Sequence, residues 1–176
     1  MKQVYIVTGA NGHLGSTIIR QLRKQKKQVR GLILPGETGK DDALVQYIRG
    51  DVRNEESLQP LFEGLQGEQI VVIHTAGIVD ISGEVTRDLY DVNVGGTRNM
   101  VHLCLQHGVK RMVYVSSVHA IPETGRWRVL KEVKHFSPAR VVGGYAKTKA
   151  EATQAVLDAV HERGLNACVV HPSGIL

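Results

Sequence analysis

A tyrosine and a lysine stand four residues apart in the segment Tyr145-Ala146-Lys147-Thr148-Lys149. If this segment is helical, Tyr145 and Lys149 lie on one face, with Cβ atoms about 5–6 Å apart. A free tyrosine has a pKa of about 10, and a neighbouring cation favours the phenolate and lowers that pKa. The spacing therefore predicts that Lys149 lowers the pKa of Tyr145, so that the phenol can exchange a proton with a substrate oxygen.

A second polar group follows the apolar run Val113-Tyr114-Val115, which ends in Ser116-Ser117. Parallel sheets bind ligands at the carboxyl ends of their strands. A serine at such an end can hydrogen-bond a reacting substrate oxygen. From the residues alone the two serines compete for this role, and either can instead satisfy only the loop backbone.

A glycine-rich turn, Thr8-Gly9-Ala10-Asn11-Gly12-His13-Leu14-Gly15, follows the first β-like run and leads into a helical pattern. Gly9 permits a tight turn, Gly12 lets the backbone approach a pyrophosphate, and Gly15 lets the helix pack closely. The helix N-terminus offers free N–H groups and a positive dipole end to phosphates. We expect a dinucleotide to contact Gly9, Asn11, Gly12, His13, Leu14 and Gly15. The alternative is a glycine turn without a ligand.

Short apolar runs alternate with helical patterns along the chain and must position these groups. The predicted strands are Val4–Val7, Val29–Leu34, Tyr47–Arg49, Ile70–Ile73, Arg111–Val115 and Ala167–Val170. The clearest predicted helices are Glu84–Gln106 and Gly144–His161, and the segments 35–42 and 121–144 are predicted to be irregular. This alternation predicts an α/β fold, a doubly wound parallel sheet with helices on both faces.

The glycine turn, the Ser-Ser segment and the Tyr145/Lys149 pair together resemble the extended short-chain dehydrogenase/reductase family. Further matches follow in the family's order: Gly50-Asp51-Val52, His74-Thr75-Ala76-Gly77 and Asn93-Val94-Gly95-Gly96-Thr97. The stretch Val72–Ser117 is most similar to the branch that holds dihydroflavonol reductases and β-hydroxysteroid dehydrogenases. The resemblance implies a Rossmann fold that binds NAD or NADP.

The resemblance also implies a role for each matching residue. It assigns Ser117 to polarise the substrate carbonyl, 145 − 117 = 28 residues before Tyr145. Asn93 would help to organise the site, and Lys149 would hold the nicotinamide ribose. The expected cofactor contacts beyond the glycine turn are Leu34, Asp51, Val52, His74, Thr75, Ala76, Gly77, Tyr145, Lys149 and Pro172.

These assignments predict an oxidoreductase that transfers hydride between nicotinamide and a hydroxyl or carbonyl group of a small-molecule substrate, through Ser117, Tyr145 and Lys149. The same apparatus serves nucleotide-sugar epimerases and dehydratases that retain NAD, which is one alternative. Another alternative is a non-catalytic, nucleotide-binding regulator. The presence of all three catalytic residue types disfavours the regulator.

The choice between NAD and NADP is made near the end of the second strand. An acid there binds the ribose 2′-hydroxyl of NAD, or an arginine accommodates the 2′-phosphate of NADP. Family members usually have Asp or Arg where Leu34 aligns, and this chain has neither. Glu37 can serve NAD, whereas Lys40 or Arg30 can serve NADP, so the sequence leaves the choice open.

The last six residues, which begin with His171-Pro172, resemble a family segment that leads into the substrate region. We therefore expect residues 1–176 to form one NAD(P)-binding domain without the C-terminal substrate lobe of the family. Because positioning of the substrate supplies much of such catalysis, we expect weak or absent turnover from this chain alone.

The chain carries 22 basic and 17 acidic side chains, a formal charge of +5. Much of the excess lies between Arg20 and Arg30 without interleaved aromatic residues, which favours a solvated helix end over a nucleic-acid site. No cluster of histidines has metal-ligand spacing, so no metal is expected. No apolar run approaches the roughly 18 residues of a membrane span, and no signal peptide is recognised. Two cysteines in apolar runs fit a reducing compartment, so we expect a cytoplasmic protein.

The resemblance also allows a homodimer, because relatives pair through helices equivalent to Glu84–Gln106 and Gly144–His161. The alternative is that the apolar stripes of both helices face only the chain's own sheet. His119, two residues beyond Ser117, either lines the site or is a structural loop histidine.

Overall fold

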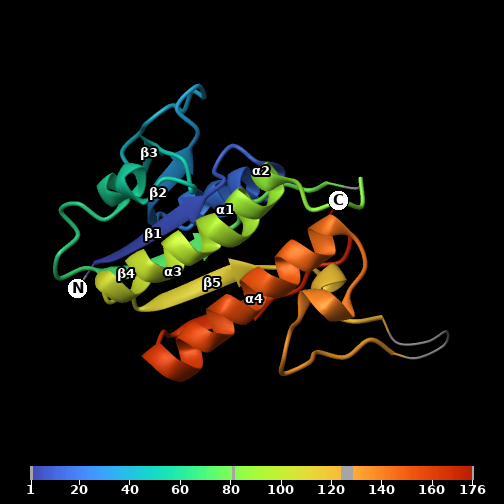
Figure 1. The fold of residues 1–176 in the computed structure, drawn as a ribbon. Helices are drawn as coiled ribbons and strands as arrows, with labels where there is room; N and C mark the ends of the chain where they lie inside the picture. Colours follow the sequence, from blue (N-terminus) through green and yellow to red (C-terminus); the bar gives the residue numbers. More distant parts are fainter. Residues whose placement is uncertain (1, 81, 124–128, 176) are drawn as a thin grey trace.

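The computed structural model describes residues 2–80, 82–123 and 129–175, so part of the predicted irregular segment 121–144 and Leu176 lie outside the described residues. Its six strands form one parallel sheet in the order β3-β2-β1-β4-β5-β6 (Figure 1). The chain winds from β1 to one edge and then returns to add β4 on the other side of β1. The predicted doubly wound parallel sheet is confirmed. The strands are β1 (Gln3–Thr8), β2 (Gln28–Ile33), β3 (Val45–Arg49), β4 (Gln69–His74), β5 (Arg111–Val115) and β6 (Ala167–Val170).

The strand ends differ from the predicted ones by one or two residues at most. β5 and β6 have the predicted bounds, and β2 is shifted by one residue toward the N-terminus. β3 begins at Val45 rather than Tyr47, because Val45 pairs with Val29 of β2 and is buried. Its side chain adds apolar area to the core, which the short run Tyr47–Arg49 alone did not indicate.

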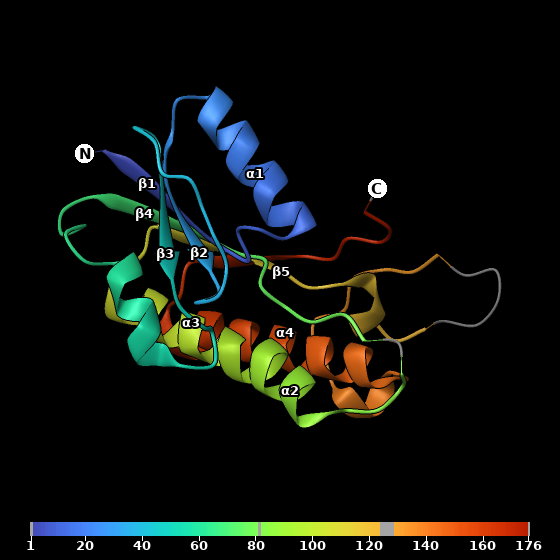
Figure 2. The same cartoon turned by 90° about the horizontal axis from the view of Figure 1, so that it is seen from above.

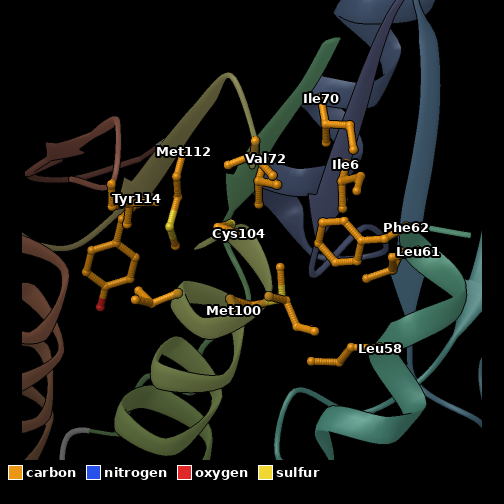
Figure 3. Close-up of a cluster of buried hydrophobic side chains, with 14 of the residues drawn as sticks. Ile6, Leu58, Leu61, Phe62, Ile70, Val72, Met100, Cys104, Met112 and Tyr114 are labelled. Carbon is orange, nitrogen blue, oxygen red and sulfur yellow. The ribbon is translucent and has the colours of Figure 1, made fainter. Parts of the chain in front are cut away.

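Helices cover both faces of the sheet (Figure 2). Helix α1 (His13–Lys24) packs on one face, and α2 (Arg87–Tyr90), α3 (Gly96–Gln106) and α4 (Gly144–Arg163) lie on the other. Successive strand residues point to opposite faces, so Ile6 joins the cluster under α3 while Val7 joins the cluster under α1. Figure 3 shows Ile6 and Val72 packed with Phe62 and Met100 in the first of these clusters.

The predicted helix Glu84–Gln106 was wrong at its start and in its regularity. The helix begins at Arg87, because the Thr86 hydroxyl accepts a bond from the Leu89 N–H and caps the first turn. Val85, expected on the apolar stripe, lies before the helix and is exposed. A π-helical turn, Asp91–Gly95, then separates α2 from α3. Such wide turns occur often at functional sites.

Helix α4 begins at the predicted Gly144 and runs two residues beyond the predicted end, to Arg163. Gly164 adopts a left-handed conformation, with φ of 70°, and ends it. The apolar stripes of α3 and α4 are buried in the chain's own core, through Met100 and Leu103 on α3 and Val156 on α4. These side chains are used within the chain itself, so they give no evidence for a homodimer, which stays a prediction. Of the helices in the described ranges, none has both the length and the apolar character that crossing a bilayer requires.

Candidate active site and cofactor groove

The glycine turn folds back on itself between β1 and α1. Gly9 has φ of +65°, and a Cβ on it would lie 3.0 Å from the backbone of Ala76. The Gly12 N–H donates to the Gly9 carbonyl at 3.0 Å, and Gly12 is the N-cap of α1. A Cβ on Gly15 would clash with the Gly9 carbonyl. The three glycines thus let the turn lie against itself and against the segment that follows β4.

A cavity of about 430 Å³ opens beside this turn, and we call it the first cavity. Its walls come from the carboxyl ends of β1, β2, β3 and β4, the position at which open parallel sheets bind ligands. The cavity is also lined by Arg53, Ile78, Asp88 and Val92, which the sequence did not predict as site residues because no motif marks them. Eight of the predicted contact residues line it: Gly9, Asn11, Gly12, Leu34, Asp51, Val52, Ala76 and Gly77.

An ion-pair network stands at one end of the first cavity. The Arg53 guanidinium binds both oxygens of Asp51, with an Nη2–Oδ2 distance of 2.7 Å, and it contacts Asp88 at 3.3 Å. The hydrogen bond from Arg53 lowers the pKa of Asp51 and keeps it ionised. Asp51 therefore lines the cavity as a carboxylate that Arg53 already holds in place.

A second cavity, of about 460 Å³, brings Ser117, Tyr145 and Lys149 together. Ser117 follows β5 and the other two belong to the first turns of α4, so the carboxyl end of the strand meets the start of the helix. The two cavities share Gly77 and Ile78 and are therefore neighbours. Three further residues predicted to contact a dinucleotide, Leu14, Thr75 and Pro172, line the second cavity.

Tyr145 is partly buried beside Ser117 and His119. Burial raises the pKa of the Tyr145 phenol, and a hydrogen bond with Ser117 opposes that effect. The His119 ring meets the Tyr145 ring edge-on, with centroids 6.2 Å apart, so His119 does line the site. The expectation that Lys149 lowers the pKa of Tyr145 was wrong, because burial is the larger influence and raises it.

Lys149 is almost fully buried, with 4% of its surface exposed. Its ammonium donates to the Val115 carbonyl at 3.0 Å and lies 5.1 Å from the centroid of the Tyr114 ring. Burial lowers the pKa of Lys149 to about 8. An ammonium has three donors, so the bond to Val115 leaves two for a ligand.

Asn93 lies behind the second cavity rather than in its wall. Its Oδ1 accepts from the Ile78 N–H at 2.8 Å, and its Nδ2 donates to the Ile78 carbonyl and to the Thr148 hydroxyl. The side chain therefore ties the segment after β4 to helix α4. The predicted role in organising the site fits a positioning residue, and the structure shows no direct exposure of Asn93 to the cavity among the residues that it describes.

Three other residues with predicted cofactor contacts, His13, Gly15 and His74, line neither cavity within the described part of the chain. His13 is the exposed first residue of α1, and Gly15 is buried against the turn. His74 is completely buried beneath the groove, between the Thr8 and Thr97 hydroxyls at 2.7 and 3.1 Å. The predicted contact of the His74 side chain with the cofactor does not fit this position, because β4 continues through His74 and the side chain is buried in the core.

The candidate residues for NADP recognition do not reach the first cavity. The Arg30 guanidinium donates to the carbonyls of Pro60, Leu61 and Glu63 at 2.7–3.3 Å, and Arg30 lines a different cavity with Lys2 and Gln28. The suggestion that Arg30 serves a 2′-phosphate was therefore wrong. β2 directs this side chain to the carbonyls of residues 60–63, and the cavity that it lines lies near the start of the strands, beside Lys2 and Gln28.

Comparison with known proteins adds independent evidence. The 3-beta hydroxysteroid dehydrogenase/isomerase family model matches residues 6–176. The sequence is 34% identical to sterol demethylase protein B of Methylococcus capsulatus, over 97% of this chain and 51% of that protein. It is 31% identical to mouse (Mus musculus) 3 beta-hydroxysteroid dehydrogenase type 7, over 98% of this chain and 50% of that enzyme. The chain thus spans about half the length of these curated relatives.

Solved structures show the same fold. The crystal structure of gox2253 superposes with a TM-score of 0.82 at 29% identity, covering 96% of this chain and 51% of that one. The UDP-glucose 4-epimerase of Thermus thermophilus, in complex with NAD, superposes with a TM-score of 0.78 at 23% identity, covering 96% and 54%. At that identity the epimerase supports the fold alone.

Proposed function

Because this chain belongs to the 3-beta hydroxysteroid dehydrogenase/isomerase family, we propose that it binds a nicotinamide dinucleotide and moves a proton during hydride transfer to or from a small-molecule substrate. The observation that carries this proposal is the second cavity, which gathers Ser117, Tyr145 and Lys149 at the carboxyl edge of the sheet. Ser117 follows β5 whereas Tyr145 and Lys149 lie on α4, so their convergence depends on the fold as well as on the spacing within one helix. The dehydrogenase family to which residues 6–176 match supports the choice of cofactor class.

The two cavities fit the two halves of such a dinucleotide. The first would hold the adenosine half, with Asp51 and Val52 at the adenine. The pyrophosphate would lie against Gly9 and Gly12, where the N-terminus of α1 provides N–H donors and a positive dipole end. The nicotinamide half would extend past Gly77 into the second cavity, where a bound nicotinamide supplies or accepts the hydride.

Each catalytic residue has a distinct proposed role. Ser117 and Tyr145 would hydrogen-bond the substrate oxygen that changes between carbonyl and hydroxyl. Lys149 would donate to the nicotinamide ribose hydroxyls with the two N–H groups that the Val115 carbonyl leaves. Asn93 would act through Ile78 and Thr148, by fixing the wall of the cavity against α4.

At neutral pH the raised pKa keeps the Tyr145 phenol protonated, which is the form that the reduction direction needs. A neutral phenol donates its proton to a carbonyl oxygen as hydride arrives at the carbonyl carbon. In the oxidation direction the phenol must first lose its proton, which a raised pKa opposes. The protonation state of this residue thus suits it to act as a general acid.

The walls of the second cavity favour an apolar ring compound as the substrate. Ile78, Val79 and Ile175 line it, and the Val79 side chain is 72% exposed. Apolar side chains that face solvent around a catalytic site gain free energy when an apolar ligand covers them. A nucleotide sugar, the substrate of the alternative epimerase or dehydratase function, would offer these side chains polar groups instead.

A fluorescence titration tests the proposed cofactor site. The chain would be titrated with NADH and NADPH separately, following the emission of the reduced nicotinamide. We expect saturable binding of at least one, abolished in Gly12→Trp, because the indole would fill the space that the pyrophosphate needs. Gly95→Trp, at a glycine with open space around it, controls for the added indole. Absence of binding by both cofactors in a chain that circular dichroism shows to be folded would overturn the proposal.

A panel of carbonyl substrates then tests the reaction. Under single-turnover conditions with NADH, a steroid or flavonoid ketone should be reduced, whereas UDP-glucose should not be epimerised with added NAD. Single turnover is chosen because it separates the chemical step from product release. Epimerisation of the sugar without ketone reduction would favour the alternative function.

A further inference from the structure

The first cavity contains an acidic side chain, Glu37, that the glycine turn holds in place. Oε2 of Glu37 accepts from the Leu34 N–H at 3.0 Å and from the Asn11 side-chain amide at 3.2 Å. The same amide of Asn11 donates to the Thr38 carbonyl at 3.3 Å. The loop after β2 is thus tied to the turn between β1 and α1, and Glu37 lines the cavity next to Asn11.

These contacts leave the other carboxylate oxygen of Glu37 available. Both bonds go to Oε2, and Oε1 takes part in neither. The carboxylate is therefore fixed in orientation by two donors and still able to accept a bond from a ligand hydroxyl. An acceptor that is already ordered loses little conformational entropy when a ligand binds.

The charges around the cavity are predominantly negative. The charged residues that line it are Glu37, Asp51, Asp88 and Arg53. Arg53 binds Asp51 at 2.7 Å and Asp88 at 3.3 Å, so two carboxylates neutralise the one cation among these residues. A ligand group that brings further negative charge close to Glu37 is repelled by its carboxylate. The described lining offers no free cation to offset that repulsion.

The other basic residues near β2 do not change this balance. Arg30 is held by three backbone carbonyls and does not line the first cavity. Lys40 does not line the first cavity either. The next residue, Asp41, accepts from the Tyr47 N–H, so this part of the loop lies beside β3. Leu34 is half exposed at the end of β2 and carries no charge.

We propose that Glu37 makes this cavity selective for NAD over NADP. This inference rests on the proposed dinucleotide site. The ribose 2′-hydroxyl of NAD would donate to Glu37, whereas the 2′-phosphate of NADP would bring about two negative charges to the same carboxylate. Like-charge contact in a partly enclosed site suppresses the wrong ligand, and we expect at least about a tenfold difference in Kd.

Glu37→Gln separates the charge of the side chain from its shape. Glutamine keeps an oxygen that can accept from Leu34 and Asn11, and it removes the negative charge. We expect the variant to bind NADPH several-fold more tightly and NADH about two- to tenfold more weakly, because a charge-assisted hydrogen bond becomes a neutral one. Glu162→Gln makes the same change of net charge at an exposed position in the last turn of α4 and should leave both Kd values unchanged.

The experiment measures Kd for NADH and NADPH in the wild-type chain and in both variants, by fluorescence at low and high salt. The inference is supported if the wild-type chain prefers NADH and Glu37→Gln reduces the ratio of the two Kd values at least about tenfold at low salt. The reduction should be smaller at high salt, because salt screens the charge of Glu37. Equal affinity or preference for NADPH in the wild-type chain overturns it. A preference for NADH that Glu37→Gln leaves unchanged overturns the assignment to Glu37. Failure of both cofactors to bind the folded wild-type chain is a different result, because it contradicts the proposed dinucleotide site itself.

Discussion

The Thr8 hydroxyl lies 2.7 Å from Nδ1 of His74, and the neighbouring bonds determine which atom carries the hydrogen. Oγ1 of Thr8 accepts from the N–H groups of Thr75 and Ala76, both at 3.1 Å. A hydroxyl has two acceptor lone pairs and one proton, so Thr8 donates to Nδ1. His74 therefore carries its proton on Nε2, which donates to the Thr97 hydroxyl at 3.1 Å. This neutral imidazole joins the end of β1 to α3 beneath the groove.

The burial of His74 predicts a loss of stability in acid. Burial, with a smaller effect of the Lys149 charge, lowers the pKa of His74 from 6.5 to about 3. Between these values the unfolded chain binds a proton that the folded chain does not. The free energy of unfolding should therefore fall as pH falls below 6.5, by up to about 1.4 kcal/mol per pH unit from this group. Urea denaturation at several pH values between about 4 and 7 measures it.

The variant His74→Gln isolates this contribution, because glutamine can donate and accept but does not titrate. We expect it to be about 1–3 kcal/mol less stable at neutral pH, since an amide does not reproduce the geometry of both threonine bonds. Its stability should also depend less on pH than that of the wild-type chain. His135→Gln, at an exposed histidine, should retain the full dependence. Equal pH dependence in His74→Gln and the wild-type chain would contradict the role of His74.

Lys149→Met is predicted to weaken NADH binding by at least about tenfold, because hydrogen bonds from a charged donor contribute about 1.5–3 kcal/mol each. Burial lowers the pKa of Lys149 from 10.5 to about 8, so the folded state opposes its charge at neutral pH. The wild-type chain should gain stability from this group as pH rises from 8 to 10.5, and the methionine variant should not. Fluorescence titration and urea denaturation measure the two effects.

Lys147→Met is the matched control for Lys149→Met. Lys147 is exposed on the same helix, two residues away, and lines neither cavity in the described part of the chain. It should retain the Kd for NADH and the pH dependence of the wild-type chain. A similar loss of NADH affinity in both variants would show a general effect of charge and contradict the proposed contact of Lys149 with the ribose.

The sequence predicted the sheet well because nearly continuous runs of Val, Ile and Leu mark parallel strands that are covered on both faces. It failed at the start of α2. Val85 continues the apolar spacing of the helix, yet the Thr86 hydroxyl caps the Leu89 N–H and places Val85 outside. The π-helical turn Asp91–Gly95 was also missed, because one extra residue in a turn hardly alters a spacing of three and four.

The motifs identified which residues surround the site, but they did not predict how deeply these residues are buried or how their pKa values shift. His74 belongs to a recognised motif, but its complete burial depends on how far β4 extends. The pKa of Tyr145 was expected to fall, because the spacing to Lys149 is visible in the sequence whereas burial is not. Glu37 and Asn11 are 26 residues apart, and only the path of the loop after β2 brings them into contact.

Gly77→Ala is predicted to impair NADH binding more than folding. A Cβ on Gly77 would lie 3.1 Å from Oδ1 of Asn93 and 3.3 Å from Nζ of Lys149, so the lysine would have to shift. We expect the Kd for NADH to rise about tenfold or more, since one strong bond of the ammonium is displaced. Gly95→Ala, where a Cβ meets open space, should bind normally and be equally or more stable. Normal binding in Gly77→Ala would show that the contact is not needed.

Tyr145→Phe removes only the phenol oxygen that is proposed to donate the proton. The rate of carbonyl reduction should fall at least about a hundredfold in single turnover, the scale of general acid catalysis, while the Kd for NADH changes little. Burial raises the pKa of Tyr145, so the wild-type rate should stay level through neutral pH and fall only at alkaline pH, where the phenol loses its proton. Tyr5→Phe removes a hydroxyl bonded to Gln3, away from both cavities within the described residues, and controls for loss of a phenol. If Tyr145→Phe reduced the substrate at the wild-type rate, proton donation would have to come from elsewhere, with His119 at the edge of the Tyr145 ring as the next residue to replace.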